Sequence, residues 1–161
     1  MIKRWVVNSS PLILLGKTDN LELLGALTDV AAVPKAVVNE VGIKPDGVPI
    51  LRVIEQNPPY RVVSDEAVLP EIFSWDLGAG ETQVIANALL HGADRVVIDD
   101  LEARRCARSM GLNVIGTLGI IGRAKVAGRI ERATPVIERL RESGLYVSEE
   151  LVQRLLHEVG E

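Results

Sequence analysis

Short apolar runs alternate along the chain with longer segments that have helical character. Apolar runs at residues 5–7, 30–33, 95–98 and 113–115 are typical of buried strands. The last two are followed by helical segments at residues 101–110 and 118–127, which end at Gly111 and Gly128. This order of strand and helix predicts an α/β fold with a parallel sheet and right-handed connections.

The remaining segments extend the same alternation. After the first strand, Ser10 suits a helix N-cap and Pro11 the first helical position, so a helix follows there. Residues 20–27 form one or two further amphipathic turns, and Pro34 begins a helix that carries Glu40. The proline-containing segment 42–63 predicts one short helix and one short strand.

Towards the C-terminus the pattern is clearer. A helix begins after Gly78 and Gly80 and ends at Gly92. Two more helices, at residues 135–143 and 149–157, finish the chain, and neither a linker nor a repeat divides it. We therefore expect a single domain over residues 1–161, with C-terminal helices from about 133 to 157.

Composition narrows the functional classes. The chain of 161 residues is 47% hydrophobic but only 3% aromatic, which disfavours an aromatic platform for stacking bases. Its single cysteine, Cys106, excludes an internal disulfide and a cysteine-rich zinc site. The first twenty residues lack a signal-peptide pattern, and no apolar run reaches the ~18 to 20 residues that span a bilayer. We expect a cytoplasmic protein without a membrane partner.

Charge is unevenly distributed. The net charge of −4 provides no general attraction to nucleic acid. Residues 1–100 contain 14 acidic and 8 basic side chains, whereas residues 103–132 contain seven basic side chains and one acid. This asymmetry predicts either a solvated helix face or a local surface where Arg104, Arg105 or Arg108 positions an RNA backbone.

Polar residues follow the predicted strands at the edge where open parallel sheets bind ligands. Asn8, Ser10, Asp99, Asp100 and Thr117 occupy these positions. Two helical acids, Glu40 and Glu81, can point toward the same edge, and Glu81 shares a face with apolar residues. Several converging carboxylates need a hard cation, so we expect Mg²⁺ or Mn²⁺, ions that support phosphodiester hydrolysis.

Each of these residues also has a structural alternative. Asp99 has capping-box spacing with Glu102, and Asp100 can equally cap the following helix. Glu81 can complement a helix N-terminus, Glu40 can be solvated in the last turn of its helix, and Thr117 can be an N-cap. His91 and His157 are explained by nearby helix C-termini, and Cys106 by the core. The glycines of segment 116–122 are interpreted as helix-packing residues, because the segment lacks the P-loop lysine and the dinucleotide-binding spacing.

Four segments together resemble a PIN domain. They are residues 6–13, residues 80–81, residues 97–104 and residues 111–119. The chain is similar in particular to the small prokaryotic branch related to toxin nucleases of type II toxin-antitoxin modules. The resemblance implies a three-layer α/β/α sandwich with a central parallel sheet, a Mg²⁺ or Mn²⁺ site, and endoribonuclease activity on single-stranded RNA. It also implies a homodimer and a protein antitoxin as partner.

The resemblance assigns roles residue by residue. The family's first acid falls on Asn8, the second on Glu40, the third on Glu81, and the last on Asp99 or Asp100. Ser10 matches its small hydroxyl residue, and Thr117 lies where a further polar side chain joins the site.

Asn8 is a departure from the family, because an amide can ligate a metal but lacks the charge of a carboxylate. Two functions therefore stay open. One is a metal-dependent ribonuclease, and the other is a catalytically impaired PIN-like domain that binds RNA or protein. A phosphoacceptor receiver domain is disfavoured, because the acid pair it needs after the first strand is missing. The apolar stripe Leu151, Val152, Leu155 and Leu156 indicates core packing, or a dimer contact if it is exposed.

Overall fold

A five-stranded, all-parallel sheet lies at the centre of the computed structural model, which describes residues 1–161. The strand order is β3-β2-β1-β4-β5. The strands are β1 (Arg4–Val7), β2 (Val30–Pro34), β3 (Tyr60–Val63), β4 (Arg95–Val97) and β5 (Val114–Ile115). The predicted strands, their parallel arrangement and the α/β class are thereby confirmed.

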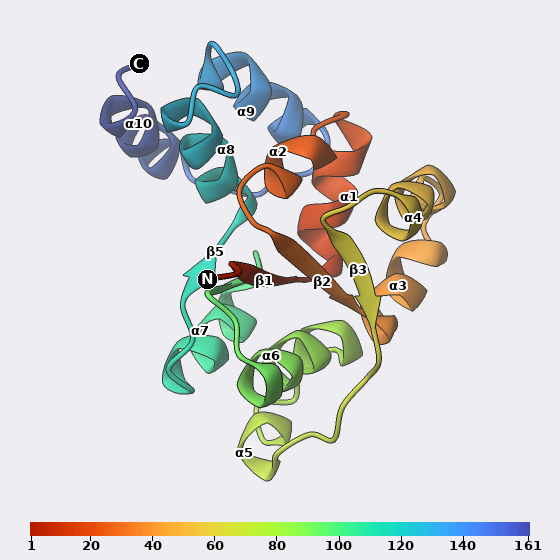
Figure 1. The fold of residues 1–161 in the computed structure, drawn as a ribbon. Helices are drawn as coiled ribbons and strands as arrows, with labels where there is room; N and C mark the ends of the chain where they lie inside the picture. Colours follow the sequence, from red (N-terminus) through yellow and green to blue (C-terminus); the bar gives the residue numbers. More distant parts are fainter.

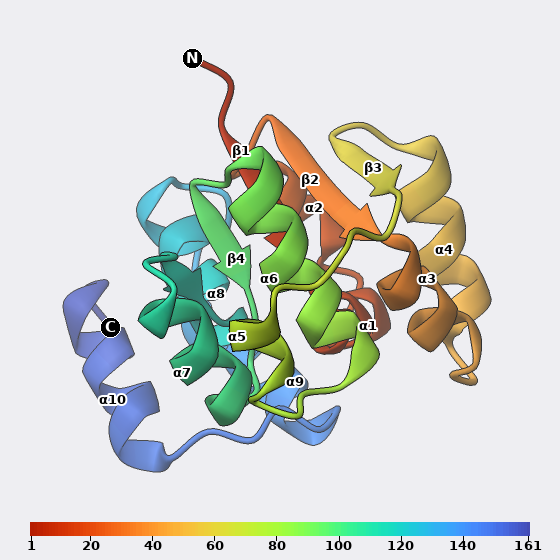
Figure 2. The same ribbon diagram turned by 90° about the horizontal axis from the view of Figure 1, so that it is seen from below.

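Helices cover both faces of this sheet, as a three-layer α/β/α sandwich requires (Figures 1 and 2). One face carries α5 (Pro70–Phe73), α6 (Ala79–His91) and α7 (Leu101–Ser109). The other carries α1 (Ser9–Lys17), α2 (Leu21–Gly25), α8 (Thr117–Val126) and α9 (Ala133–Glu142). Beside β3 lie α3 (Lys35–Gly42) and α4 (Gly47–Gln56), and α10 (Glu149–Glu158) packs against α8.

The strands are buried on both sides, which explains their continuous apolar runs. Val6, Val7, Val96 and Val97 are completely inaccessible to solvent. Cys106, as expected, lies in the core. No helix has the length and apolar character needed to span a membrane.

The start of α1 differs from the prediction. The helix begins at Ser9, so Asn8 rather than Ser10 is the N-cap residue, and Pro11 is the third helical residue. The reason is that β1 ends at Val7, where the Asn8 N–H still pairs with the carbonyl of Val97 at 3.0 Å. The chain therefore turns directly from strand to helix at Asn8. The short α5 was not predicted.

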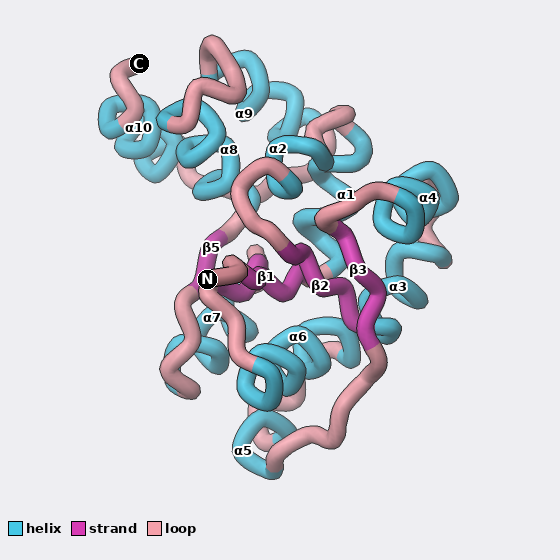
Figure 3. Tube along the Cα trace, in the orientation of Figure 1, coloured by secondary structure: helices cyan, strands magenta, loops and turns pink.

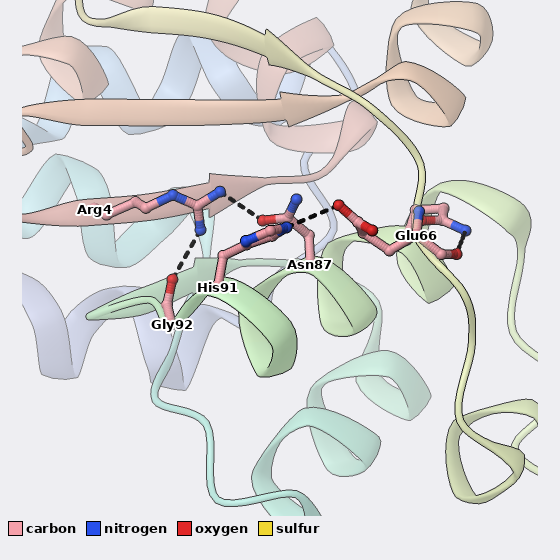
Figure 4. A network of polar contacts seen from close by, with 6 residues as sticks. Arg4, Glu66, Asn87, His91 and Gly92 are labelled. Atoms are coloured by element: carbon pink, nitrogen blue, oxygen red, sulfur yellow. Dashed lines mark hydrogen bonds and ion pairs between the residues drawn. The ribbon is translucent and has the colours of Figure 1, made fainter.

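A polar network near the C-terminal end of α6 anchors this helix to the sheet (Figure 4). Arg4 of β1 donates to the carbonyl of Gly92 at 2.8 Å and to Oδ1 of the buried Asn87 at 2.6 Å. His91 Nε2 lies 2.8 Å from Glu66 Oε1, so this histidine contacts a carboxylate of the preceding connection as well as a helix terminus. The network fixes α6 at one end, and Glu81 lies at the other.

Candidate active site

The site lies where the connections of the sheet change direction. From β1 the chain passes to β2 on one side, and β4 lies on the other side of β1. In the β1–β4 ladder Val7 is aligned with Val97, so Asn8 and the residues after β4 leave the same edge together. Figure 3 shows the strands in the middle of the molecule with helices on both sides of them. Ligands of open α/β sheets bind in such crevices, outside the carboxyl ends of the strands.

A cavity of about 1020 Å³ opens at this edge. Among the residues that line it are Asn8, Ser10, Glu81, Asp99, Asp100, Arg104 and Arg108. Further lining residues come from the connection between α9 and α10 and from α10 itself. A second cavity, of about 800 Å³, contains none of the predicted site acids. The chain therefore brings most of the predicted site residues to one concave surface.

Two buried side chains, Trp5 through Nε1 and Asn8 through Oδ1, have a polar atom without a hydrogen-bond partner, and of the two only Asn8 lines the cavity. Its side chain is only 3% exposed, and its Oδ1 has no hydrogen-bond partner. An unpaired buried carbonyl oxygen costs about 1–3 kcal/mol. Asn8 also lines the cavity, so this unsatisfied oxygen belongs to a residue of the site.

Glu40 is held by contacts from two other helices. Its Oε2 accepts from the hydroxyl of Ser9 at 2.8 Å, and its Oε1 accepts from the backbone N–H of Gly80 at 2.9 Å. A Cβ atom on residue 80 would lie 2.5 Å from Glu40 Oε2, so only glycine permits this approach. Glu40 thus joins α1, α3 and α6 beside the cavity, whose lining does not include it.

Glu81 experiences the negative charge of the site directly. Desolvation is the main reason that the pKa of its carboxyl is raised, and the charge of Asp100 raises the pKa further. Glu40 adds a smaller effect in the same direction, whereas the N–H of Gly78, which donates to Glu81 at 3.4 Å, lowers the pKa. Three carboxylates from distant parts of the chain therefore interact electrostatically at this edge.

Asp99 is engaged by the start of α8. Its Oδ1 accepts from the backbone N–H of Thr117 at 2.8 Å, and its Oδ2 accepts from the Thr117 hydroxyl at 2.7 Å. Gly116, rather than Thr117, is the N-cap residue of α8. A Cβ atom at Gly116 would lie 2.9 Å from Asp99 Oδ1 and 2.6 Å from a guanidinium nitrogen of Arg104. Gly116 therefore makes room for Asp99 and Arg104, and the predicted helix-packing role is wrong for this glycine. The packing role is confirmed for Gly119, which lies against Ile115, and for Gly122, which lies against Leu155.

Asp100 has a different environment. It is the N-cap residue of α7, and its Oδ2 accepts from the N–H of Ala103 at 3.0 Å. The sequence left open whether Asp99 or Asp100 caps this helix, and in the structure Asp100 is the cap. Its Oδ1 makes no hydrogen bond, and its charge acts on Glu81. Of the aspartate pair, only Asp100 thus has an oxygen without a hydrogen-bond partner.

The three arginines of α7 differ in position. Arg104 donates to the carbonyl of Ile98 at 3.1 Å, and its half-buried guanidinium has a lowered pKa, caused mainly by desolvation and then by Arg108. Arg104 and Arg108 both line the cavity. Arg105 instead pairs with Glu102 at 2.6 Å and is not among the lining residues.

The donor set at the edge fits a small hard cation. As the side chains stand, no three His, Cys, Asp or Glu residues form a group that could hold a metal ion. Mg²⁺, however, is commonly bound through one or two carboxylates and keeps several waters. Glu81, Asp100 and the unpartnered amide oxygen of Asn8 supply such a set, and they all line the same cavity.

These features define an α/β sandwich with an acidic site at the carboxyl edge of a parallel sheet. A protein-family model described as a PIN domain matches residues 4–161, so the chain belongs to the PIN-domain family. No curated protein matches the chain. The PIN assignment therefore depends on the family model together with the fold.

Three residues of the site were missed by the sequence analysis. Ser9, rather than Ser10, contacts Glu40, while Ser10 lines the cavity without a side-chain hydrogen bond. Gly80 and Gly116 make room for Glu40 and for Asp99 with Arg104. The sequence signals for the two glycines were their positions immediately before Glu81 and Thr117 and within the segments that resemble a PIN domain.

Proposed function

We propose that this PIN-domain protein is a metal-dependent endoribonuclease that cleaves single-stranded RNA, as a toxin-type PIN nuclease does. The observation that carries the proposal is the unpartnered Oδ1 of Asn8, buried at a cavity that Glu81 and Asp100 also line. PIN domains are generally nucleases, and a nuclease site needs negative oxygen ligands of this kind.

Glu81, Asp100 and Asn8 are proposed to hold Mg²⁺ or Mn²⁺. Asp100 is preferred to Asp99 because its Oδ1 is free, whereas Thr117 engages both oxygens of Asp99. Asp99 then acts as a positioning residue that fixes the end of β4 relative to α8. Glu40 adds negative charge and is oriented by Ser9 and Gly80.

The chemistry follows from this arrangement. A bound Mg²⁺ or Mn²⁺ lowers the pKa of a coordinated water and neutralises charge that develops on the phosphodiester. Arg104 and Arg108 lie on the same cavity and orient the RNA backbone through its phosphates. Desolvation and the charge of Asp100 raise the pKa of Glu81, and a cation bound beside this carboxylate would act in the opposite direction.

The cellular setting is proposed by analogy with the toxin-type branch. It comprises cytoplasmic RNA as substrate, a protein antitoxin and a homodimer. Val152 and Leu156 of the predicted apolar stripe are buried and Leu151 is exposed, so the stripe serves mainly the core of the protein.

The direct test is cleavage of a single-stranded RNA oligonucleotide by the Glu81→Gln variant. We expect Mn²⁺-dependent cleavage by the native chain, and a loss of at least about a hundredfold in the variant because a charged ligand is removed. Glu102→Gln is the matched control, since Glu102 is exposed and pairs with Arg105 outside the cavity lining. Undiminished cleavage by Glu81→Gln would rule out the assigned site.

A second candidate function is a PIN-like module that binds RNA or protein without cleaving it. Asn8 favours this alternative, because the site has one carboxylate fewer than the family pattern. The two functions differ in one measurement. A native chain that binds RNA but leaves it intact at saturating Mn²⁺ is a binding module, whereas metal-dependent cleavage by the native chain excludes that role.

A further inference from the structure

The connection between α9 and α10 presents a single aromatic side chain at the cavity of the site. Tyr146 is fully exposed, its hydroxyl makes no hydrogen bond, and it lines the same cavity as the acids. Large aromatic side chains are normally at least partly buried, so a fully exposed one beside a polar cavity needs a reason.

The backbone on both sides of Tyr146 is firmly held. Leu145 is buried, and its N–H donates to the carbonyl of Leu140 at 2.9 Å. Arg141 donates to the carbonyl of Val147 at 3.3 Å and pairs with Glu149 at 2.7 Å. Ser148 then caps α10 by accepting from the N–H of Leu151. The ring therefore projects from a short connection that is anchored on each side, which lowers the entropy cost of binding through it.

The neighbouring lining residues combine apolar and basic character. Leu101 and Leu151, which are 57% and 44% exposed, line the cavity with Tyr146. Arg154 of α10 faces the cavity together with Arg104 and Arg108, and its pairing with Glu150, at 3.5 Å, involves exposed groups that form only a weak ion pair. Glu158 is the one further acid of the lining.

This composition suits a single-stranded polynucleotide better than a duplex. Unpaired bases offer flat apolar faces to an aromatic ring and to leucines, while arginines contact the phosphates between them. A duplex would keep its bases stacked, leaving an exposed tyrosine without a flat partner. Tyr146, Leu151 and Arg154 line the same cavity as the acids, so one bound strand would contact both groups.

We propose that Tyr146 stacks on an unpaired base of single-stranded RNA next to the cleaved phosphodiester, with Arg154 on the adjacent phosphate. This inference deepens the proposed ribonuclease function and depends on it for the identity of the ligand. The low aromatic content of 3% disfavours a platform of several stacking side chains, but one tyrosine at the cavity is enough to stack on one base.

The test measures RNA binding separately from cleavage. Affinity for a ten-nucleotide single-stranded oligouridine is measured by fluorescence anisotropy in EDTA, where metal-dependent cleavage cannot occur. Tyr146→Ala should weaken binding about tenfold, because a base–aromatic stack is lost, while Tyr146→Phe should retain the affinity. Arg154→Ala should also weaken binding and reduce its dependence on salt concentration.

Phe73→Ala is the matched control, because Phe73 is an exposed aromatic on α5, outside the cavity lining. An equal effect of Phe73→Ala and Tyr146→Ala would overturn the proposal, and so would unchanged RNA affinity of Tyr146→Ala. Unchanged RNA affinity together with loss of a dimer would show instead that Tyr146 contacts a second copy of the chain.

The stacking role of Tyr146 and the proposed nuclease activity can fail independently of one another. Tyrosine-dependent binding in EDTA without any Mn²⁺-dependent cleavage supports the stacking role and removes the nuclease. Normal Mn²⁺-dependent cleavage, combined with RNA binding that does not depend on Tyr146, supports the nuclease and removes the stacking role.

Discussion

Asp99 accepts two hydrogen bonds from one residue, the backbone N–H of Thr117 at 2.8 Å and its hydroxyl at 2.7 Å. Thr117 is completely buried, so neither bond is exposed to solvent at its donor. The pair connects the chain leaving β4 to the first turn of α8, 18 residues later. Asp99 therefore connects two segments that line the cavity, while the charge of Asp100 acts on Glu81.

Replacing Thr117 tests this connection. Thr117→Val keeps the shape of the side chain but removes the hydroxyl, which leaves one oxygen of Asp99 short of a donor. We expect a loss of about 1–3 kcal/mol in the free energy of unfolding. Thr117→Ser retains the hydroxyl and should lose less than about 1.5 kcal/mol, measured by urea denaturation. Equal destabilisation by the two variants would show that the methyl group, not the hydroxyl, is the important contact.

The approach of Glu40 to Gly80 makes a second prediction. Gly80→Ala places a Cβ atom 2.5 Å from Glu40 Oε2, so the carboxylate must move and lose its bonds to Ser9 and to the backbone. We expect Mn²⁺-dependent cleavage to fall at least about tenfold, as displacement of positioning groups does. Gly78→Ala is the control, since its Cβ would meet only Glu81 Oε2 at 3.8 Å.

The circular dichroism spectrum and thermal midpoint show whether Gly80→Ala still folds. A folded Gly80→Ala protein that cleaves as fast as Gly78→Ala would mean that the position of Glu40 does not affect the site.

The contacts of Glu161 predict how the free energy of unfolding depends on pH. Its carboxylate accepts bonds from the N–H groups of Ala133 and Thr134 and from the Thr134 hydroxyl, at the start of α9. The Ala133 bond is the main reason that its pKa falls from 4.5 to about 2. Because the folded state has the lower pKa, the stabilisation is complete above about pH 4.5 and is lost as the pH falls towards 2.

Glu161→Gln should therefore flatten the decline of the urea midpoint between pH 5 and 2, and it should lower the midpoint at pH 7. Glu150→Gln is the control, because Glu150 is exposed and has only a weak contact with Arg154. A native-like acid profile in Glu161→Gln would show that other carboxyls cause the acid sensitivity.

The sheet and the polar residues at its edge were predictable because both depend on local pattern. Apolar runs defined the strands, and the residue after each strand necessarily lies at the carboxyl edge, which identified Asn8, Asp99 and Asp100. Glu40 was also proposed from its place on a helix next to this edge, and the family resemblance supported it, but the contact that brings it beside α6 is tertiary.

The contacts between these residues were not predictable. The choice between Ser9 and Ser10 depended on the first residue of α1, which is set by a backbone bond from Asn8 to Val97, far along the chain. The functions of Gly80 and Gly116 depend on carboxylates 40 and 17 positions away in sequence, whose approach no local pattern encodes. The same holds for Tyr146, whose exposure follows from the anchoring of the residues beside it.

Asn8→Asp tests how the missing charge of the site affects both stability and metal binding. In EDTA the added carboxylate would be buried beside Glu81, Asp99 and Asp100, so we expect a lower thermal midpoint than that of the native chain. In Mn²⁺ the order should reverse, because a third charged ligand strengthens binding and a ligand of the folded state raises its stability. The Mn²⁺ concentration that gives half of the thermal shift should fall about tenfold or more.

Asn8→Ala, which removes the oxygen altogether, should need more Mn²⁺ than the native chain. If Asn8→Asp raised the midpoint in EDTA, or if all three proteins responded equally to Mn²⁺, the oxygen of residue 8 would not face a cation site.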